Sequence, residues 1–149
     1  MRPDSRLSRM LHVLIHLADA DGRATSEEIA AMLGTNPVVV RRTMAGLRDH
    51  GYVRSEKGHG GGWSLATPLA DISLLDIHAA LGSPAPFAFG LANDDPDCLV
   101  EKAVNAHLSD AMADAEALLR SRLAAVTLAD IAADFQKRLA SGAGRRGAR

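Results

Sequence analysis

Two adjacent arginines, Arg41 and Arg42, follow a segment that has the residues of a helix start. The side-chain oxygen of Asn36 can cap such a helix, and Pro37 is favoured at its first position, where an N–H would have no partner. A helix that enters the major groove of DNA presents its N-terminal part to the bases, and arginine is the commonest bidentate partner of guanine. The candidate DNA contacts on this helix are Asn36, Val38, Val39, Arg41 and Arg42. The alternative is an arginine pair on a solvent-exposed helix face.

A glycine-rich turn follows the same helix, between two short runs at 52–56 and 63–66 that are typical of strands. Together they predict a two-stranded wing. Glycines allow a backbone to approach a duplex closely, so the candidate contacts to the DNA backbone or minor groove are Lys57, His59 and Gly60. The wing could instead only support the helix. We expect Trp63 to pack at the base of the wing rather than to stack on DNA.

Two further helices are predicted before the arginine pair. Apolar residues recur at helical spacing from Leu7 to Ala18, and Thr25 with Glu28 forms the capping-box pattern of a second helix. The hydroxyls of Thr25 and Ser26 lie at that helix start, where they could bind a DNA phosphate or serve only as caps.

The second half of the chain predicts three more helices. Ser73 caps a short helix that ends at Leu81, a helix of about 25 residues follows Cys98, and Thr127 with Asp130 starts the last one. The long helix carries an apolar stripe that we expect to pair with a second copy of the chain. The residues of this predicted dimer face are Val104, Leu108, Met112, Ala115, Leu119 and Leu123. The alternative is a helix that lies back on its own domain.

These elements predict a mainly α fold with a small two-stranded β-wing. The expected organisation is a winged helix-turn-helix domain at 1–82, a proline-rich linker at 83–97, dimerisation helices at 98–141 and a disordered basic tail at 142–149.

Composition restricts the setting of this domain. With a net charge of −1, the chain lacks the strongly basic surface of a non-specific nucleic-acid binder, so DNA binding must depend on a few placed contacts and on salt. No apolar run approaches the roughly 20 residues of a membrane span, and the N-terminus has no signal-like pattern. The chain has 1 cysteine, which fits a reducing compartment. We therefore expect a cytoplasmic protein.

The order of these parts resembles the Rrf-two family of dimeric bacterial winged-helix regulators, which includes the iron-sulfur cluster regulator. The resemblance covers roughly residues 5 to 135. It is carried by Thr25 to Leu47, Gly51-Tyr52-Val53-Arg54-Ser55, Gly58-His59-Gly60-Gly61-Gly62-Trp63-Ser64-Leu65-Ala66, Leu74-Leu75-Asp76-Ile77 and the long helix led by Cys98.

The family resemblance implies an iron-sulfur cluster held by three cysteines, and this sequence departs from it. Only Cys98 is present, so we expect no cluster and no other cofactor. Cys98 could instead be a redox switch, or it could be inert. Neighbouring aspartates disfavour its thiolate, whereas a helix start favours it.

Other chemistries fit less well. The run from His59 to Gly62 matches the oxyanion loop of some esterases, but it overlaps the serine motif that such a hydrolase needs further along the chain. His12 and His16 are one helical turn apart, yet Val13 stands where a zinc peptidase has its glutamate. We therefore predict no enzyme. A metal sensor that uses His12, His16 and His78 remains an alternative.

The function predicted from the sequence is a homodimeric repressor that binds a pseudo-palindromic operator, with recognition helices about one DNA turn apart. A signal would act by changing the angle between the two winged domains through the linker. The alternative is a winged-helix protein-interaction module that does not bind DNA.

Overall fold

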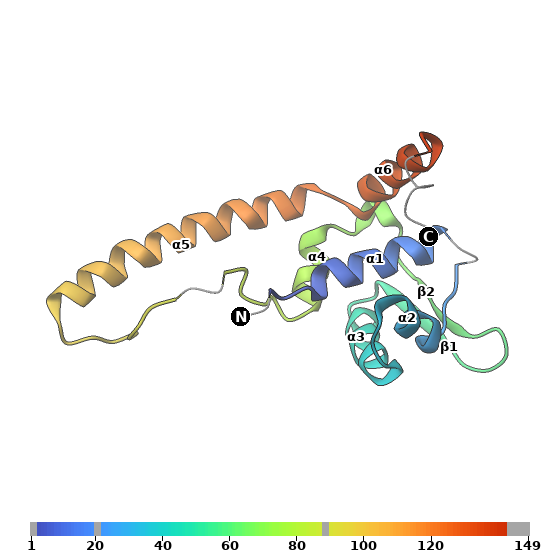
Figure 1. Ribbon diagram of the computed structural model, residues 1–149, viewed down its shortest axis with the longest axis horizontal. Coiled ribbons are helices and arrows are strands. Elements are labelled where there is room, and N and C mark those ends of the chain that lie inside the picture. Colours follow the sequence, from blue (N-terminus) through green and yellow to red (C-terminus); the bar gives the residue numbers. More distant parts are fainter. Residues whose placement is uncertain (1–2, 20–21, 88–89, 143–149) are drawn as a thin grey trace.

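The computed structural model of the chain describes residues 3–19, 22–87 and 90–142. In chain order its elements are α1 (Arg6–Asp19), α2 (Ser26–Leu33), α3 (Pro37–Asp49), β1 (Val53–Glu56), β2 (Gly62–Leu65), the 3-10 helix η1 (Leu69–Asp71), α4 (Leu74–Ala80), α5 (Leu99–Ala125) and α6 (Leu128–Ala140). The mainly α fold with a two-stranded wing is confirmed (Figure 1).

The core of the winged domain is aliphatic. Apolar residues on one face of α1 meet those of α2, α3 and α4, and the largest fully buried side chains include Leu14, Ile29, Met44, Leu47 and Ile77. Burying each such side chain stabilises the fold by about 1.5–3 kcal/mol relative to leaving it exposed. This core holds α2 and α3 at a fixed angle to each other.

The helix starts follow the predicted capping chemistry. Thr25 accepts a hydrogen bond from the Glu28 amide, and the Glu28 carboxylate accepts one from the Thr25 amide. Asn36 caps α3 with Pro37 as the first helical residue. Ser73 with Asp76 and Thr127 with Asp130 form two further capping boxes, at α4 and α6.

The wing is an antiparallel pair in which Val53 lies opposite Leu65 and Glu56 lies opposite Gly62. A single β-bridge joins it to the loop before α2, through hydrogen bonds of 3.0 and 2.8 Å between the backbones of Ala24 and Trp63. Gly62 has φ +134, and a Cβ there would lie 2.8 Å from the Ala24 carbonyl oxygen. This glycine therefore serves the approach of the wing to its own domain rather than to a duplex.

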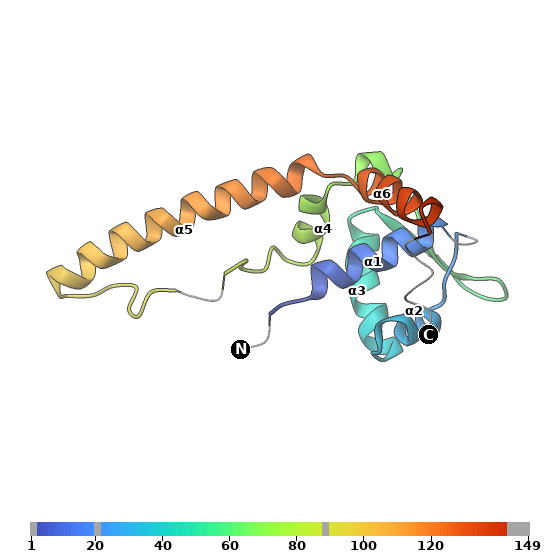
Figure 2. The ribbon, with the colours of Figure 1, turned by 45° about the horizontal axis from the view of Figure 1, so that its top comes forward.

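The chain closes on itself at the start of α6. The Leu128 amide donates to the Ile72 carbonyl at 2.9 Å, the Leu74 amide donates to the Val126 carbonyl at 3.0 Å, and Leu128 is fully buried in the core. α6 then packs on α1 (Figure 2). The segment 98–141 was predicted to contain two dimerisation helices. Of these two, α6 packs on the winged domain, and α5 projects away from it.

α5 has 27 residues, which corresponds to a length of about 40 Å. Its C-terminal end contacts α4, and the rest projects from the winged domain (Figure 1). None of its residues is buried. A helix of this length with no buried residue lacks the packing that normally stabilises helices in proteins.

The predicted tail at 142–149 lies outside the described residues except for residue 142. Among the helices of the described part, none is long and apolar enough to cross a membrane.

Candidate nucleic-acid interface

The N-terminal half of α3 exposes both apolar and basic side chains. Asn36 accepts hydrogen bonds at Oδ1 from the Val38 amide at 3.0 Å and the Val39 amide at 3.1 Å, so its oxygen is used in capping. Val38 and Val39 are 59% and 45% exposed. Valine side chains in such a position can contact the methyl group of thymine.

The two arginines of α3 differ in their surroundings. The Arg41 guanidinium forms an ion pair of 2.8 Å with the carboxylate of Glu27 on α2, and both side chains are more than half exposed. Arg42 is exposed and makes no hydrogen bond or ion pair within the described residues. Because exposed ion pairs contribute only about 0–1 kcal/mol, Glu27 orients Arg41 without preventing its release to a phosphate or a base.

The two hydroxyl residues at the start of α2 also differ in their surroundings. Thr25 caps the helix, which was one of the two roles that the sequence predicted for it. Ser26 is only 8% exposed, and its Oγ accepts a hydrogen bond of 3.0 Å from the Trp63 indole, so its hydroxyl has a structural partner, and its contact with a DNA phosphate stays a prediction. Tryptophan needs a partner for its N–H when it is buried, and Ser26 supplies it.

Trp63 lies at the base of the wing, as predicted, with 6% of its surface exposed. The Arg48 guanidinium lies 6.0 Å from the centre of its ring, at the distance limit of a cation–π contact. Trp63 therefore links β2 to both α2 and α3, and it fixes the wing relative to the recognition helix.

One basic residue that the sequence gave no reason to select contacts the wing from outside it. Arg23, in the loop before α2, donates a hydrogen bond to the Gly60 carbonyl and forms an ion pair of 3.1 Å with Glu56. Lys57 and His59 are exposed and make no polar contact within the described part of the chain. Figure 1 shows α2, α3 and the wing on the side of α1 opposite α6. The candidate contacts of α3 and the wing therefore share one side of the domain.

Replacing Arg23 with alanine is expected to free the wing tip and to weaken DNA binding by roughly threefold to tenfold, with little loss of stability, because the side chain is half exposed. Operator titrations by fluorescence anisotropy measure the effect. Arg6→Ala, which removes an equally exposed ion pair on α1, is the control. Equal affinities of the wild type and the Arg23 variant would show that the brace does not contribute.

Cys98 caps α5 and is exposed. The nearby backbone amides of Glu101 and Val100, at the start of α5, lower the pKa of the Cys98 thiol, although its sulfur forms no capping hydrogen bond. The helix start thus favours the thiolate, and the neighbouring aspartates do not reverse this effect.

The three histidines proposed for a metal sensor are not brought together. His12 and His16 lie on α1 beside α6, whereas His78 lies on α4 with its Nε2 2.9 Å from the Pro84 carbonyl. Across residues 3–19, 22–87 and 90–142, no group of three or more His, Cys, Asp or Glu side chains is positioned to hold a metal ion.

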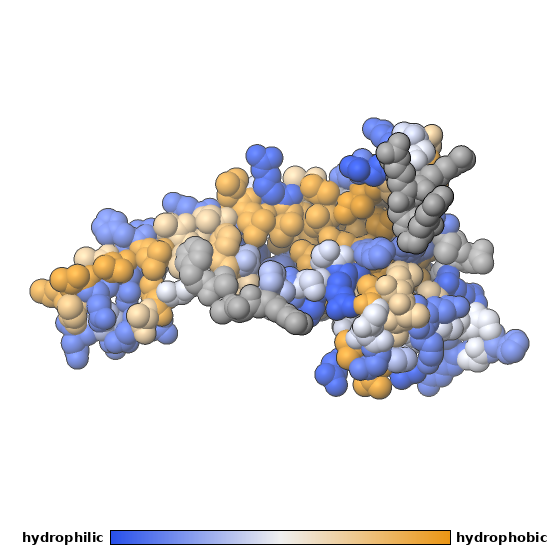
Figure 3. Space-filling model, viewed as in Figure 1, coloured by the Kyte–Doolittle hydropathy of each residue, from blue (hydrophilic) through white to orange (hydrophobic). Residues whose placement is uncertain are grey.

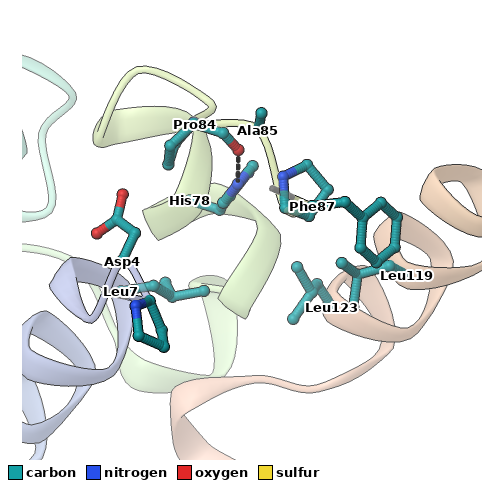
Figure 4. A pocket seen from close by; sticks show the side chains of 10 residues that line it. Asp4, Leu7, His78, Pro84, Ala85, Phe87, Leu119 and Leu123 are labelled. Carbon is teal, nitrogen blue, oxygen red and sulfur yellow. Dashed lines mark hydrogen bonds between the residues drawn. The ribbon is translucent and has the colours of Figure 1, made fainter. Parts of the chain in front are cut away.

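A cavity of about 540 Å³ lies where the N-terminal segment, α4, the linker and α5 meet. In Figure 4 the Phe87 ring lies beside Leu119 and Leu123 of α5, with Asp4 and Leu7 across the cavity. The Arg6 side chain and amide hold the pKa of the Asp4 carboxyl at about 2. Leu119 and Leu123, which the sequence assigned to the dimer face, therefore face their own domain at this junction.

Of the other residues in the predicted dimer face, Val104 and Ala115 are exposed, and Leu108 and Met112 are half-buried. Val104 is 54% exposed, and it lines a shallow apolar trough on α5 with Leu108. Leu99 and Val100 add exposed apolar surface before the predicted stripe, and Leu118, which lies within the stripe, is also exposed. Figure 3 shows apolar residues along α5 from its free end to the junction.

Comparison with known proteins gives consistent matches. The family model described as Rrf2, iron-dependent transcriptional regulator, matches residues 4–134. A Bacillus subtilis protein, YwnA, whose name places it among HTH-type transcriptional regulators, is 33% identical over 128 residues, or 86% of this chain and 95% of YwnA.

Solved structures show the same fold. A crystal structure from Lactobacillus plantarum, described as a transcriptional regulator, has a TM-score of 0.71 and 27% identity over 97% of this chain and 99% of the other. CymR, the global cysteine regulator of B. subtilis, has a TM-score of 0.58 and 24% identity over 89% of this chain and 98% of its own, a likeness of fold.

The description of the family as iron-dependent raises the question of an iron-sulfur cluster. Such clusters are held mainly by cysteine thiolates, and the sequence has 1 cysteine. His107, one possible substitute, lies nine residues after Cys98 on the exposed surface of α5. The donor set therefore does not fit a cluster within one chain.

The arrangement of α2, α3 and wing, the match along nearly the whole chain, and the shared fold agree with one another. The predicted family and the absence of an enzymatic role are confirmed by relatives that are regulators. The chain belongs to the Rrf2 family of winged-helix transcriptional regulators.

Proposed function

We propose that the chain is a homodimeric repressor that binds a pseudo-palindromic DNA operator. The observation that carries this proposal is the exposed N-terminal half of α3. Among the described residues, the side chain of Arg42 has no polar partner, Arg41 has one surface ion pair, and Val38 and Val39 are exposed. A helix start of this composition, next to a braced wing, is suited to the major groove.

The second subunit follows from α5. The helix projects beyond the core and exposes apolar side chains at Leu99, Val100 and Val104, which are 80%, 71% and 54% exposed. An apolar surface on a projecting helix is stabilised when it packs against its own copy. Two winged domains joined in this way present two recognition helices to two half-sites.

Genome-wide recovery of DNA bound to the tagged chain tests the proposed function. The expected result is enrichment of a few sites that contain an inverted repeat. Recovery of no specific DNA would instead favour the protein-interaction module, and recovery of direct repeats would contradict the symmetric dimer.

The regulator is proposed to sense its signal without a cluster, through Cys98. A thiolate attacks one oxygen of a peroxide such as hydrogen peroxide, and the products are a sulfenic acid at Cys98 and water after proton transfer. The α5 amides that lower the pKa of the thiol favour the attacking form. Protein prepared without oxygen is expected to be colourless, and visible absorbance from iron and sulfide would contradict this proposal.

The pH dependence of Cys98 alkylation is a direct prediction. Because the pKa is lowered from its usual value of 9.0, the rate of reaction with iodoacetamide should reach half its maximum below pH 9. Mass spectrometry of the labelled chain measures the rate, and Cys98→Ser is the unlabelled control. A half-maximum at or above the value for free cysteine would refute the assignment. Peroxide should change DNA binding by the wild type and not by Cys98→Ser.

A further inference from the structure

The imidazoles of His12 and His16 converge on the surface of α1. Their Nε2 atoms are 2.9 Å apart, their ring centres are 4.7 Å apart, and both side chains are exposed. Within the described residues, neither ring nitrogen has another hydrogen-bond partner. Two nitrogens this close form one hydrogen bond to each other, or they direct two lone pairs at one metal ion.

We infer that His12 and His16 form a two-histidine binding site for a divalent copper ion. The observation that carries the inference is the distance between the two Nε2 atoms. With metal–nitrogen bonds of about 2.0–2.1 Å, a separation of 2.9 Å corresponds to an angle of about 90° at the metal. A tetrahedral angle would require a separation of about 3.4 Å.

This angle selects the metal. Ninety degrees is the angle between adjacent ligands in square-planar and tetragonal sites, which Cu²⁺ and Ni²⁺ prefer, whereas Zn²⁺ prefers tetrahedral sites. Between the first two ions, the general order of affinity favours Cu²⁺. The site should therefore bind Cu²⁺ most tightly and Ni²⁺ next. It should bind Zn²⁺ more weakly than two imidazoles that are free to adopt a tetrahedral angle would bind it.

The charges around His12 and His16 are compatible with a bound cation. His12 and His16 lie on the wall of a groove between α1 and α6, whose one charged lining residue in the described structure is Asp19. The Asp19 carboxylate accepts a hydrogen bond of 3.0 Å from Gln136, so it adds negative charge near the site without being a ligand. Because the described residues supply no third ligand, water completes the coordination.

Titration of the metal-free full chain with CuSO₄, NiCl₂ and ZnSO₄ tests the inference, with calorimetry for affinity and electron paramagnetic resonance for the copper ligands. One Cu²⁺ should bind per chain, with hyperfine coupling to two equatorial nitrogens. His12→Gln and His16→Gln should each weaken binding by about a hundredfold, because each removes one arm of a chelate. His50→Ala, which changes an exposed histidine at the C-cap of α3, should bind copper like the wild type.

Three results would overturn the inference: undiminished copper binding by the double glutamine variant, coupling to a single nitrogen, or tighter binding of Zn²⁺ than of Cu²⁺. Because both histidines are exposed, the variants should melt at the wild-type temperature, which separates lost ligands from lost fold. The metal titrations contain no DNA, so a negative result in them would leave the proposed DNA-binding function unaffected.

Discussion

Replacing Arg41 and Arg42 together with alanine is expected to weaken operator binding by about 3 kcal/mol, roughly a hundredfold, and to flatten the preference for the operator over random DNA. Both guanidiniums lie on the exposed face of α3, and neither is needed for the core. Operator and random duplexes of equal length, titrated by fluorescence anisotropy, give both quantities.

Arg138→Ala is the matched control for this variant. Arg138 is an exposed arginine whose ion pair with Asp134 lies within α6, on the side of α1 opposite α3. Its loss should leave operator affinity unchanged. If the arginine pair variant binds as tightly as the Arg138 variant, α3 does not read the operator through these residues.

Glu27 allows the two arginines to be separated. Glu27→Gln removes the ion pair that holds Arg41, and it also removes a negative charge from the proposed interface. We therefore expect tighter binding by this variant, with most of the gain lost when Arg41→Ala is added. A gain that persists in the double variant would assign the effect to charge alone.

Placing aspartate at Leu108 is expected to separate the dimer and to weaken operator binding by about 10²–10⁴-fold, because each winged domain would then bind its half-site alone. Leu108 lines the apolar trough on α5 with Val104, and a carboxylate buried there would have neither a lysine nor an arginine among the residues that line the trough. Sedimentation velocity measures the mass, and operator titration measures the affinity.

Ala106→Asp adds the same charge two residues away, on the opposite side of the helix. Ala106 is exposed and does not line the trough. This variant should remain dimeric and keep its operator affinity. A dimeric Leu108→Asp chain would place the subunit contact elsewhere.

The parts that local chemistry controls were predictable from sequence. The capping boxes at Thr25 and Ser73 and the Asn36–Pro37 start of α3 depend on residues two to three positions apart, and all lie where expected. The wing also followed from its strand-like runs and glycines, because a turn leaves a strong local pattern.

The remaining features depend on contacts between distant residues. The burial of Ser26 requires Trp63, 37 positions away, and the Arg23 brace spans the same distance to Gly60. Sequence patterns that predict helices and strands extend over fewer residues than this, so they do not reveal contacts between residues so far apart. The burial of Ser26 and the position of Arg23 could therefore not be predicted from the sequence.

The partner of the apolar stripe on α5 could not be predicted from the sequence either. Its spacing identified which side chains seek a partner, but it could not distinguish a second subunit from the domain of the same chain. At the junction, Leu119 and Leu123 face their own linker, while Val104 stays open. The position of α6 on α1 was missed for the same reason, because its apolar face fits either location.

Hydroxyl-radical footprinting of the chain on its recovered operator tests most directly whether two copies present paired recognition helices. We predict two protected blocks related by a dyad, with centres about 10 base pairs apart on one face of the duplex. A single protected block, or two blocks in direct repeat, would contradict the symmetric dimer and with it the proposed mode of DNA recognition.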